Sequence, residues 1–555
     1  MSQPPAQLLL TSEDVPLQPW LDGGCEPGAA AAEAASGPTY RVKNLRDLSG
    51  DANLLDRQKW ALVIPATEEG RRLVALVEPL TQLRTQQQGQ PVLVIEVPPG
   101  MNELEAQRWR IEQFPPLYRR VEADRPRYLL ILGDLDGVSL ATQQVLAIDG
   151  FPGRLVGDID ADYHNYVAKV LAHETQPSSF EHGRCLLYTV HDGTAATRSA
   201  HDQLIVPCQQ HLQQELPAHE VHMVGQQLDP SPDDFLTLAG QPQPTVMFSV
   251  SHGLGQPRRK DWSPREARKR QGAMSFGRNG ALERLDFASA PFIQGGIWIY
   301  FACYGAGTPQ TSHFLPWIQL LARSGTPELQ AFEKTLSTRG GFTSATVKTA
   351  LANPNGPQAI VGHLDLAWSY SYESPRLMLS PQPGKVARSD RFHDLISPVI
   401  RGQRAGVIFL HMQLSLAEIS KSILALTRSD QAAGRVSSQE RANLLGRLWL
   451  MREDLRGYVL MGDPACRLPL GPPKMQATSP SSPPTATSNA SEEDLERAGQ
   501  VEEAVLKFLA GEMSKSQIQR AYGVSRREIE GLTKIYRDAG TAALAKHLAA
   551  AKSSQ

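Results

Sequence analysis

The stretch Ile297-Trp-Ile-Tyr-Phe-Ala-Cys303-Tyr-Gly305 is a short apolar run that ends in a cysteine and a glycine. Such a run, closed by a turn residue, is typical of a strand that is buried on both faces of a parallel sheet. A second run, Thr245-Val-Met-Phe-Ser-Val250, leads directly into Ser-His252-Gly253. The two runs therefore predict two buried strands, each of which ends in a side chain capable of chemistry.

Six further apolar runs of strand length are separated by stretches of helical spacing: 60–65, 92–97, 128–132, 184–190, 220–224 and 359–362. One of the intervening stretches, 68–87, carries its leucines and a valine at helical spacing. Strands that alternate with helices predict an α/β fold, with a parallel sheet flanked by helices. The alternation of strand-like runs and helical stretches is interrupted between 155 and 183, so we expect two α/β units in series.

The ends of the chain differ in composition from its body. The first forty residues are rich in Ala, Pro and Gly, and a Pro/Ser/Thr-rich stretch precedes a final region of helical pattern. We therefore predict five parts, which are a disordered lead-in at 1–40, a non-catalytic α/β unit at 41–180, a catalytic domain at 181–470, a linker at 471–492 and a small α-helical domain at 493–555.

Composition excludes several classes of protein. The net charge of −2 gives no whole-chain reason to expect nucleic acid or an anionic membrane, and no apolar run approaches the length of roughly 20 residues that a membrane helix needs. The five cysteines are scattered and never form CxxC, which argues against disulfides and a zinc site. We therefore expect a cytoplasmic protein with no metal, no cofactor and no membrane partner.

His252 and Cys303 form the candidate catalytic pair. They are 303 − 252 = 51 positions apart, close to the roughly 50 expected between the histidine and cysteine of caspase-type enzymes. An imidazole can take the proton of a thiol and later protonate the leaving amine. The backbone N–H groups of Gly253 and Cys303 are the candidate oxyanion hole. The nearby sequences His182-Gly183 and His191-Asp192-Gly193 lack this strand context or spacing, and we interpret them as chance matches.

These residues resemble a known group of enzymes. Ser251-His252-Gly253 and Phe301-Ala-Cys-Tyr-Gly305 are similar to the His-Gly and Ala-Cys motifs of clan CD peptidases, which include caspases, gingipain-like enzymes and CHAT-domain peptidases. The segments 359–365 and 458–465 resemble two later segments of the CHAT and gingipain-like families, the second being the "Y-x-L-x-G-D-P" segment. The resemblance implies a caspase-like fold and a cysteine endopeptidase that cleaves a protein through a Cys–His dyad. Such proteins in bacteria often belong to stress or antiviral defence.

The resemblance also suggests where a substrate side chain would bind. In these families the residue two positions before the nucleophile often shapes that pocket. An acidic residue there would suit a basic substrate side chain, and caspases have glutamine there. Here the residue is Phe301, so neither preference carries over. Phe301 and Asp365 are the candidates for the substrate pocket, and Asp365 could instead orient an imidazole.

The C-terminal region carries signals of two capped helices. Ser514-Lys-Ser-Gln517 and Ser525-Arg-Arg-Glu528 match the capping box, with the turn Ala521-Tyr-Gly-Val-Ser525 between them. This plan resembles a helix-turn-helix, in which Arg526, Arg527 and Lys534 would contact DNA. A role in docking a protein partner stays open beside DNA binding. The alternative to a regulated peptidase is a catalytically inactive caspase-like scaffold or a DNA-binding regulator.

Overall fold

The computed structural model describes residues 52–471, apart from gaps at 113–124, 177, 226, 229, 256–261, 324, 326, 338–339, 376–384 and 429–437, and two short strands, β1 (Thr11–Ser12) and β2 (Val15–Pro16). Contacts between Cα atoms divide the chain into two units, Met1–Pro473 and Lys474–Gln555. The predicted helical module, most of the predicted linker and nearly all of the predicted lead-in lie outside the described residues. Arg526, Arg527 and Lys534 therefore stay predictions.

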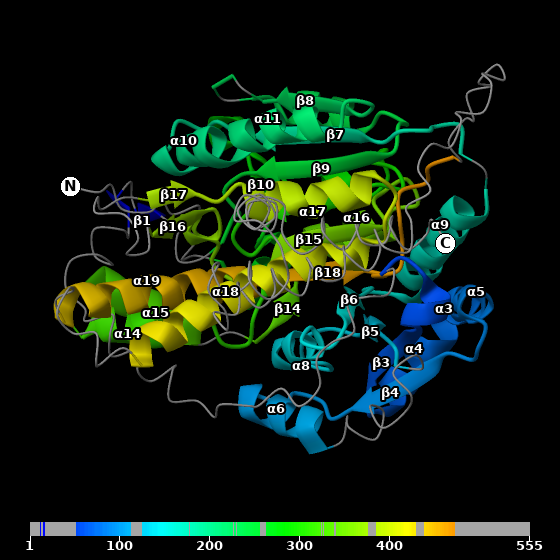
Figure 1. Cartoon of the computed structure of the whole chain (residues 1–555), viewed down its shortest axis with the longest axis horizontal. Coiled ribbons are helices and arrows are strands. Elements are labelled where there is room, and N and C mark those ends of the chain that lie inside the picture. The colour runs from blue at the N-terminus through cyan, green and yellow to red at the C-terminus, as the bar shows by residue number, and fades with distance from the viewer. Residues whose placement is uncertain are drawn as a thin grey trace, which may run out of the picture. The chain divides into compact units, whose positions relative to one another are not determined.

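A ten-stranded sheet forms the centre of the described body. In spatial order its strands are β4 (Leu93–Val97), β3 (Trp60–Pro65), β5 (Tyr128–Leu132), β6 (Phe151–Leu155), β18 (Tyr458–Gly462), β15 (Ala359–His363), β12 (Ile297–Phe301), β9 (Thr245–Val250), β7 (Arg184–Thr189) and β8 (Glu220–Val224). Figure 1 shows this order from β8 at the top to β4 at the lower right. The sheet is mostly parallel and is flanked by helices, which confirms the predicted α/β class.

The direction of the strands changes once across the sheet. β15 and β18 are antiparallel, whereas β18 and β6 are parallel, as are all the other neighbouring pairs. The strands from β4 to β18 therefore run opposite to those from β15 to β8, and their carboxyl ends lie at opposite edges. The two α/β units expected from the sequence thus share one sheet, and β18 joins them.

Burial explains why these runs form strands. Every residue of β3, β5, β6, β7, β9, β12, β15 and β18 is buried, whereas the edge strands β4 and β8 include exposed positions. Continuous apolar runs are what strands covered on both faces require. The sequence did not predict β6, because Pro152 and Gly153 interrupt its apolar pattern. Pro152 is tolerated because β18 pairs only with Gly153 and Arg154 of this strand.

The predicted helix at 68–87 is two helices, α4 (Glu68–Leu76) and α5 (Glu78–Gln88). Pro79 is the reason, because it has no N–H to continue the helical hydrogen bonds and so favours a new first turn. Val77 at the junction leaves the helical conformation, with φ −109° and ψ 13°.

The remaining α-helices surround the sheet and connect its strands. They are α3 (Leu55–Gln58), α6 (Glu103–Glu112), α8 (Leu140–Leu146), α9 (Asp160–Thr175), α10 (Ala195–Ala200), α11 (Val206–Glu215), α12 (Pro232–Ala239), α13 (Pro264–Arg270), α14 (Leu315–Ala322), α15 (Pro327–Ser337), α16 (Ala345–Ala352), α17 (Asp390–Ile400), α18 (Ile408–Arg428) and α19 (Ser438–Arg456). A π-helical turn (His201–Ile205) joins α10 to α11, and 3₁₀ turns lie at Gly277–Asn279, Arg284–Phe287, Ser369–Ser371 and Ala405–Val407.

Besides the antiparallel pair of β1 and β2, three short antiparallel pairs of the described residues lie outside the main sheet: β10 (Met274–Ser275) with β11 (Ala281–Leu282), β13 (Gly307–Thr308) with β14 (Phe342–Thr343), and β16 (Glu373–Pro375) with β17 (Lys385–Ala387). β10 and β13 belong to the chain that leaves β9 and β12, so both lie close to the candidate site.

One stretch of the described residues, Ala405–Thr427, has the length and the apolar composition of a membrane-crossing helix, with a mean hydropathy of 1.3. The sequence analysis expected no apolar run of such length, and this one is interrupted by polar residues such as Gln413 and Ser415. Its helix, α18, packs along α17 and α19 in the described body (Figure 1). Core helices of soluble proteins meet the same criterion, so the stretch is weak evidence for a membrane span.

Candidate active site

His252 and Cys303 follow two neighbouring parallel strands. β9 and β12 pair in a register that sets Val250 opposite Phe301. Ser251 then donates its N–H to the carbonyl of Phe301 at 3.2 Å, so the pairing continues one step further. His252 and Cys303, two residues beyond the paired ends, thereby come together at the carboxyl edge of this half of the sheet. Functional groups gather at this edge in parallel α/β sheets.

Gly253 is held against the backbone of Cys303. A Cβ atom at this position would lie 1.9 Å from the Cys303 carbonyl oxygen, so no side chain fits here. On the other side, Ser275 donates to the His252 carbonyl at 2.9 Å and Leu254 donates to Ala273 at 2.8 Å. In an antiparallel bridge with this pattern, the groups of the central residue point away from the partner strand. The N–H of Gly253 therefore points away from β10.

The chain turns sharply after Cys303. Gly305 donates its N–H to the carbonyl of Ala302 at 3.1 Å, which closes a β-turn. Tyr304 occupies the third position with φ 55°, a conformation that is uncommon for a residue with a side chain. Its N–H donates to the carbonyl of Asp365 at 2.8 Å, and this bond holds the turn in place. Uncommon backbone conformations of this kind often accompany functional sites.

The imidazole of His252 faces a carboxylate and a hydroxyl. Its Nε2 lies 3.0 Å from Thr194 Oγ1 and 3.4 Å from Asp192 Oδ2. Asp192 Oδ1 also accepts from the hydroxyls of Thr194 and Thr197, at 2.7 and 2.9 Å. The side chains of His252 and Asp192 are only 10% and 8% exposed. Burial opposes ionisation of Asp192, yet His252 and the hydroxyl donors lower the pKa of this carboxyl. Asp192 is therefore placed to orient the imidazole.

The sequence analysis missed Asp192 because it treated His191-Asp192-Gly193 as a chance match. The sequence did show that Asp192 follows the strand-like run 184–190, and the structure shows that this strand, β7, is the neighbour of β9 on the side away from β12. The carboxyl ends of three adjacent parallel strands thus supply Asp192, His252 and Cys303 in that spatial order. The order along a sheet cannot be read from the chain, so the neighbourhood of β7 and β9 was not predictable.

The thiol of Cys303 is covered by residues 364–372, here named the cover segment. Cys303 Sγ accepts the N–H of Ala367 at 2.9 Å and lies 3.3 Å from the Ala367 carbonyl oxygen, to which it can donate. Cys303 is completely buried, and residues 359–374 are all buried, with at most 9% of any of them exposed. Burial raises the pKa of this thiol well above its ordinary value, although the Ala367 N–H acts in the opposite direction. In the described conformation the thiol is therefore protonated and closed to solvent.

Two buried charged residues hold the cover segment. Asp454 at the end of α19 accepts the N–H of Trp368 at 3.0 Å and the hydroxyl of Ser371 at 2.7 Å. Arg391 on α17 donates to the carbonyls of Ser371 and Tyr370, at 3.1 and 3.4 Å. The cover segment is thus fixed from two helices.

Phe301 and Asp365, the predicted substrate-pocket residues, are both fully buried. Phe301 packs against the rings of three core residues, with centroids 5.7 to 5.9 Å away: Tyr372, Phe392 and Tyr458. Asp365 accepts from the Ser312 hydroxyl at 2.9 Å and from the His313 N–H at 2.8 Å, and burial raises the pKa of its carboxyl. Both side chains therefore stabilise the surroundings of Cys303, and neither faces solvent in the described conformation.

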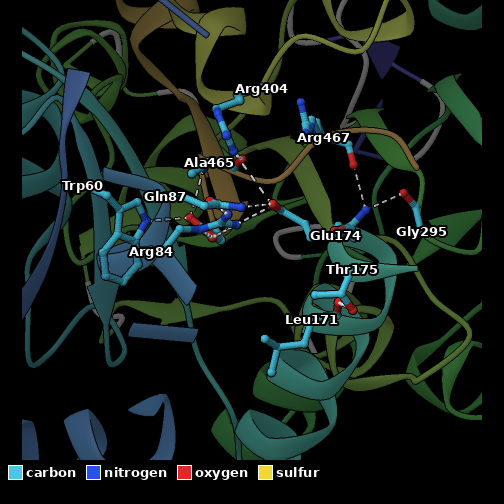
Figure 2. A network of polar contacts seen from close by, with 12 residues as sticks. Trp60, Arg84, Gln87, Leu171, Glu174, Thr175, Gly295, Arg404, Ala465 and Arg467 are labelled. Carbon is cyan, nitrogen blue, oxygen red and sulfur yellow. Dashed lines mark hydrogen bonds and ion pairs between the residues drawn. The ribbon is translucent and has the colours of Figure 1, made fainter. Parts of the chain in front are cut away.

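The Gly-Asp-Pro segment after β18 holds this late strand against the early strands and helices of the same half of the sheet. Asp463 accepts from Trp60 Nε1 at 2.9 Å and from Arg84 at 2.7 and 3.0 Å. Arg84 also pairs with Glu174 at 2.7 Å, and all three charged side chains are 0 to 1% exposed. Figure 2 shows Arg84 between Trp60 and Glu174, with Arg404 and Ala465 beside them. Because Trp60 and Arg84 come from the first half, the motif contributes to assembly of the sheet.

The fold and the site together define an α/β protein with an Asp–His–Cys constellation at the carboxyl edge of a mostly parallel sheet. No known protein family and no curated protein matches the sequence. Among solved structures, the Arg-specific cysteine proteinase gingipain R (RgpB) is 12% identical at a TM-score of 0.41, covering 74% of this chain and 78% of its own. The complex of the Porphyromonas gingivalis RgpB pro- and mature domains is 12% identical at a TM-score of 0.40, and the match covers 74% of this chain and 79% of that chain. The Saccharomyces cerevisiae separase–securin complex is 9% identical at a TM-score of 0.27, and the match covers 66% of this chain and 17% of that chain.

Proposed function

We propose that this chain is a cysteine endopeptidase that cleaves a protein substrate, with Cys303 as nucleophile and His252 as its proton-transfer partner. The observation that supports the proposal is the register of β9 and β12, because it sets the two residues at corresponding positions just beyond the carboxyl ends of adjacent strands. The two residues are far apart in the sequence, and only the parallel pairing makes them neighbours.

The reaction follows from the placement of these groups. His252 faces Asp192 and Thr194 through Nε2, so Nδ1 is the nitrogen that would take the proton of the Cys303 thiol. The thiolate attacks the carbonyl carbon of the peptide bond, and the oxyanion accepts N–H groups from Gly253 and Cys303. His252 then protonates the leaving amine, and water hydrolyses the thioester to release the acid and restore the thiol.

Access to the thiol is a second requirement of this proposal. The cover segment must move away from Cys303 before a peptide can bind, because the Ala367 backbone now contacts the sulfur. We therefore infer a latent enzyme that opens when it is activated. Recruitment through the C-terminal module, action in the cytoplasm and a part in bacterial stress or antiviral defence belong to the same proposal.

A second candidate function is a caspase-like scaffold that binds partners without cutting them. The burial of the Cys303 thiol beneath the Ala367 backbone is the observation that favours it. The DNA-binding regulator is a third reading, and a salt-dependent gel shift with residues 490–555 tests it.

Mapping of new protein N-termini in cells separates the enzyme from the scaffold. Cells with the wild-type chain should show new ends that are absent with Cys303→Ala and with His252→Ala. The matched control is Cys185→Ala, which removes another fully buried strand cysteine away from the site. Identical sets of ends in wild-type and Cys303→Ala cells would contradict the peptidase proposal.

A further inference from the structure

Two helices outside the active site bring together donors suited to a metal ion. His211 and Glu215 lie one turn apart on α11, and His393 lies on α17. One donor atom from each of the three residues lies within 4.8 Å of the others. Donors bound at about 2 Å from one ion are at most about 4 Å apart. Side-chain rotations that bring the three donor atoms slightly closer together would therefore let them bind one ion.

The contacts around these donors hold each of them in position. Glu215 Oε1 accepts from Ser397 Oγ at 2.7 Å and from Arg401 at 2.8 Å. This anchoring leaves Oε2 on the side of His211, whose Nε2 lies 3.5 Å away. The carboxylate would thus bind a metal through one oxygen.

His393 is the buried member of the group, with a relative exposure of 8%. Its ring stacks on that of His211, with centroids 3.7 Å apart. Asp394 Oδ1 lies 2.9 Å from His393 Nδ1, so Nε2 is the nitrogen directed to an ion. A carboxylate behind a metal-binding histidine is a common way to fix the ring and raise its basicity.

We propose that His211, Glu215 and His393 form a binding site for a divalent transition metal of the zinc type. Two imidazole nitrogens and one carboxylate oxygen suit Zn²⁺, and water would complete a four-coordinate shell on the exposed side. The prediction from the sequence that the chain has no metal rested on the absence of CxxC spacing. Such spacing could not reveal a site in which two of the ligands, Glu215 and His393, are 178 positions apart (393 − 215).

The position of the site suggests what metal binding does. α17 also carries Arg391, whose guanidinium holds the cover segment over Cys303. An ion that links α11 to α17 would therefore stabilise the closed position of this segment. Metal binding itself does not depend on the proposed peptidase activity.

Calorimetric titration of the full chain with ZnCl₂, in a reducing buffer, tests the site. We expect one saturable site in wild type and, in His211→Gln, His393→Gln and Glu215→Gln, binding that is weaker by at least the roughly 10- to 100-fold that loss of a group behind a ligand already costs. The matched control is His222→Gln, because His222 also pairs with a glutamate, Glu220, at 3.3 Å but belongs to no three-donor group in the described residues. A Cys303→Ala chain should bind as wild type does. Absence of saturable binding, or equal binding in wild type and His211→Gln, would overturn the proposal.

Hydrogen exchange with and without ZnCl₂ tests the link to the active site. We expect slower amide exchange in α11, α17 and the cover segment of wild type, and no change in His211→Gln. Protection confined to α11 and α17 would leave the metal site intact and overturn its coupling to Cys303.

Discussion

Asp192 contributes to the site through His252 and not through the substrate. Its carboxylate lies 3.4 Å from the imidazole Nε2 and is itself fixed by two threonine hydroxyls. An anion in this position stabilises the protonated imidazole that forms when the thiol loses its proton. Asp192 is therefore a positioning residue, and its loss should weaken catalysis without abolishing it.

Asp192→Asn should lower the rate of peptide cleavage, by less than the roughly 100- to 10,000-fold that a general acid–base residue contributes. The acidic limb of the activity–pH profile should also move to lower pH, because the neutral amide no longer favours the protonated imidazole. Steady-state cleavage of a peptide taken from the mapped ends, measured across pH, checks both. Asp202→Asn is the control, since Asp202 also pairs with a histidine, His201, at 2.9 Å. An unchanged profile in Asp192→Asn would remove Asp192 from the site.

At the scale of elements, the site depends on the close approach of the two chain segments that follow β9 and β12. The Gly253 backbone and the Cys303 backbone touch, and the bonds from Leu254 and Ser275 fix the first segment against β10. Glycine is required here by space, since its φ is not positive. The glycine of the His-Gly motif thus meets a packing requirement in addition to its proposed part in catalysis.

Gly253→Ala should force the two segments apart, because the new Cβ would lie 1.9 Å from a carbonyl oxygen. We expect a loss of roughly 1 to 3 kcal/mol of unfolding free energy, the usual range for overpacking, together with loss of cleavage. Urea unfolding and the peptide assay measure the two effects. Gly340→Ala, whose Cβ would meet only the end of the Arg268 side chain at 3.4 Å, should behave as wild type. Wild-type stability in Gly253→Ala would show that the segments are not in contact.

At the scale of the whole described body, buried charges hold the end of β18, a late segment of the chain, against the helices α5 and α9 of its early part. Arg84 comes from α5, Glu174 from α9 and Asp463 from the end of β18. Burial opposes the charge on Glu174, yet Arg84 and neighbouring donors lower the pKa of this carboxyl to about 2. Arg84 thus compensates two buried carboxylates, and Arg404 lies 3.9 Å from Glu174 as a second cation.

Arg84→Met should destabilise the body by about 3 to 5 kcal/mol, because it leaves two buried carboxylates without their partner. Chemical unfolding monitored by tryptophan fluorescence measures the change, and Trp60 reports directly on this region. Arg71→Met is the control, since Arg71 forms an exposed pair with Glu96 and should change stability little. Equal stabilities for the two variants would mean that the buried network contributes nothing.

The sequence by itself determined most of the strands and their α/β alternation, because apolar periodicity is a local property of the chain, and from spacing it predicted the His252–Cys303 pair. It did not determine β6, whose Pro152 and Gly153 break the pattern, or the interruption of the helix at Val77. Only the tertiary structure decided that Asp192 faces His252, that Ala367 covers the thiol and that Asp463 meets Arg84. Each of these contacts joins residues far apart in sequence, and strand order and burial, which the sequence does not encode locally, decide which of them form.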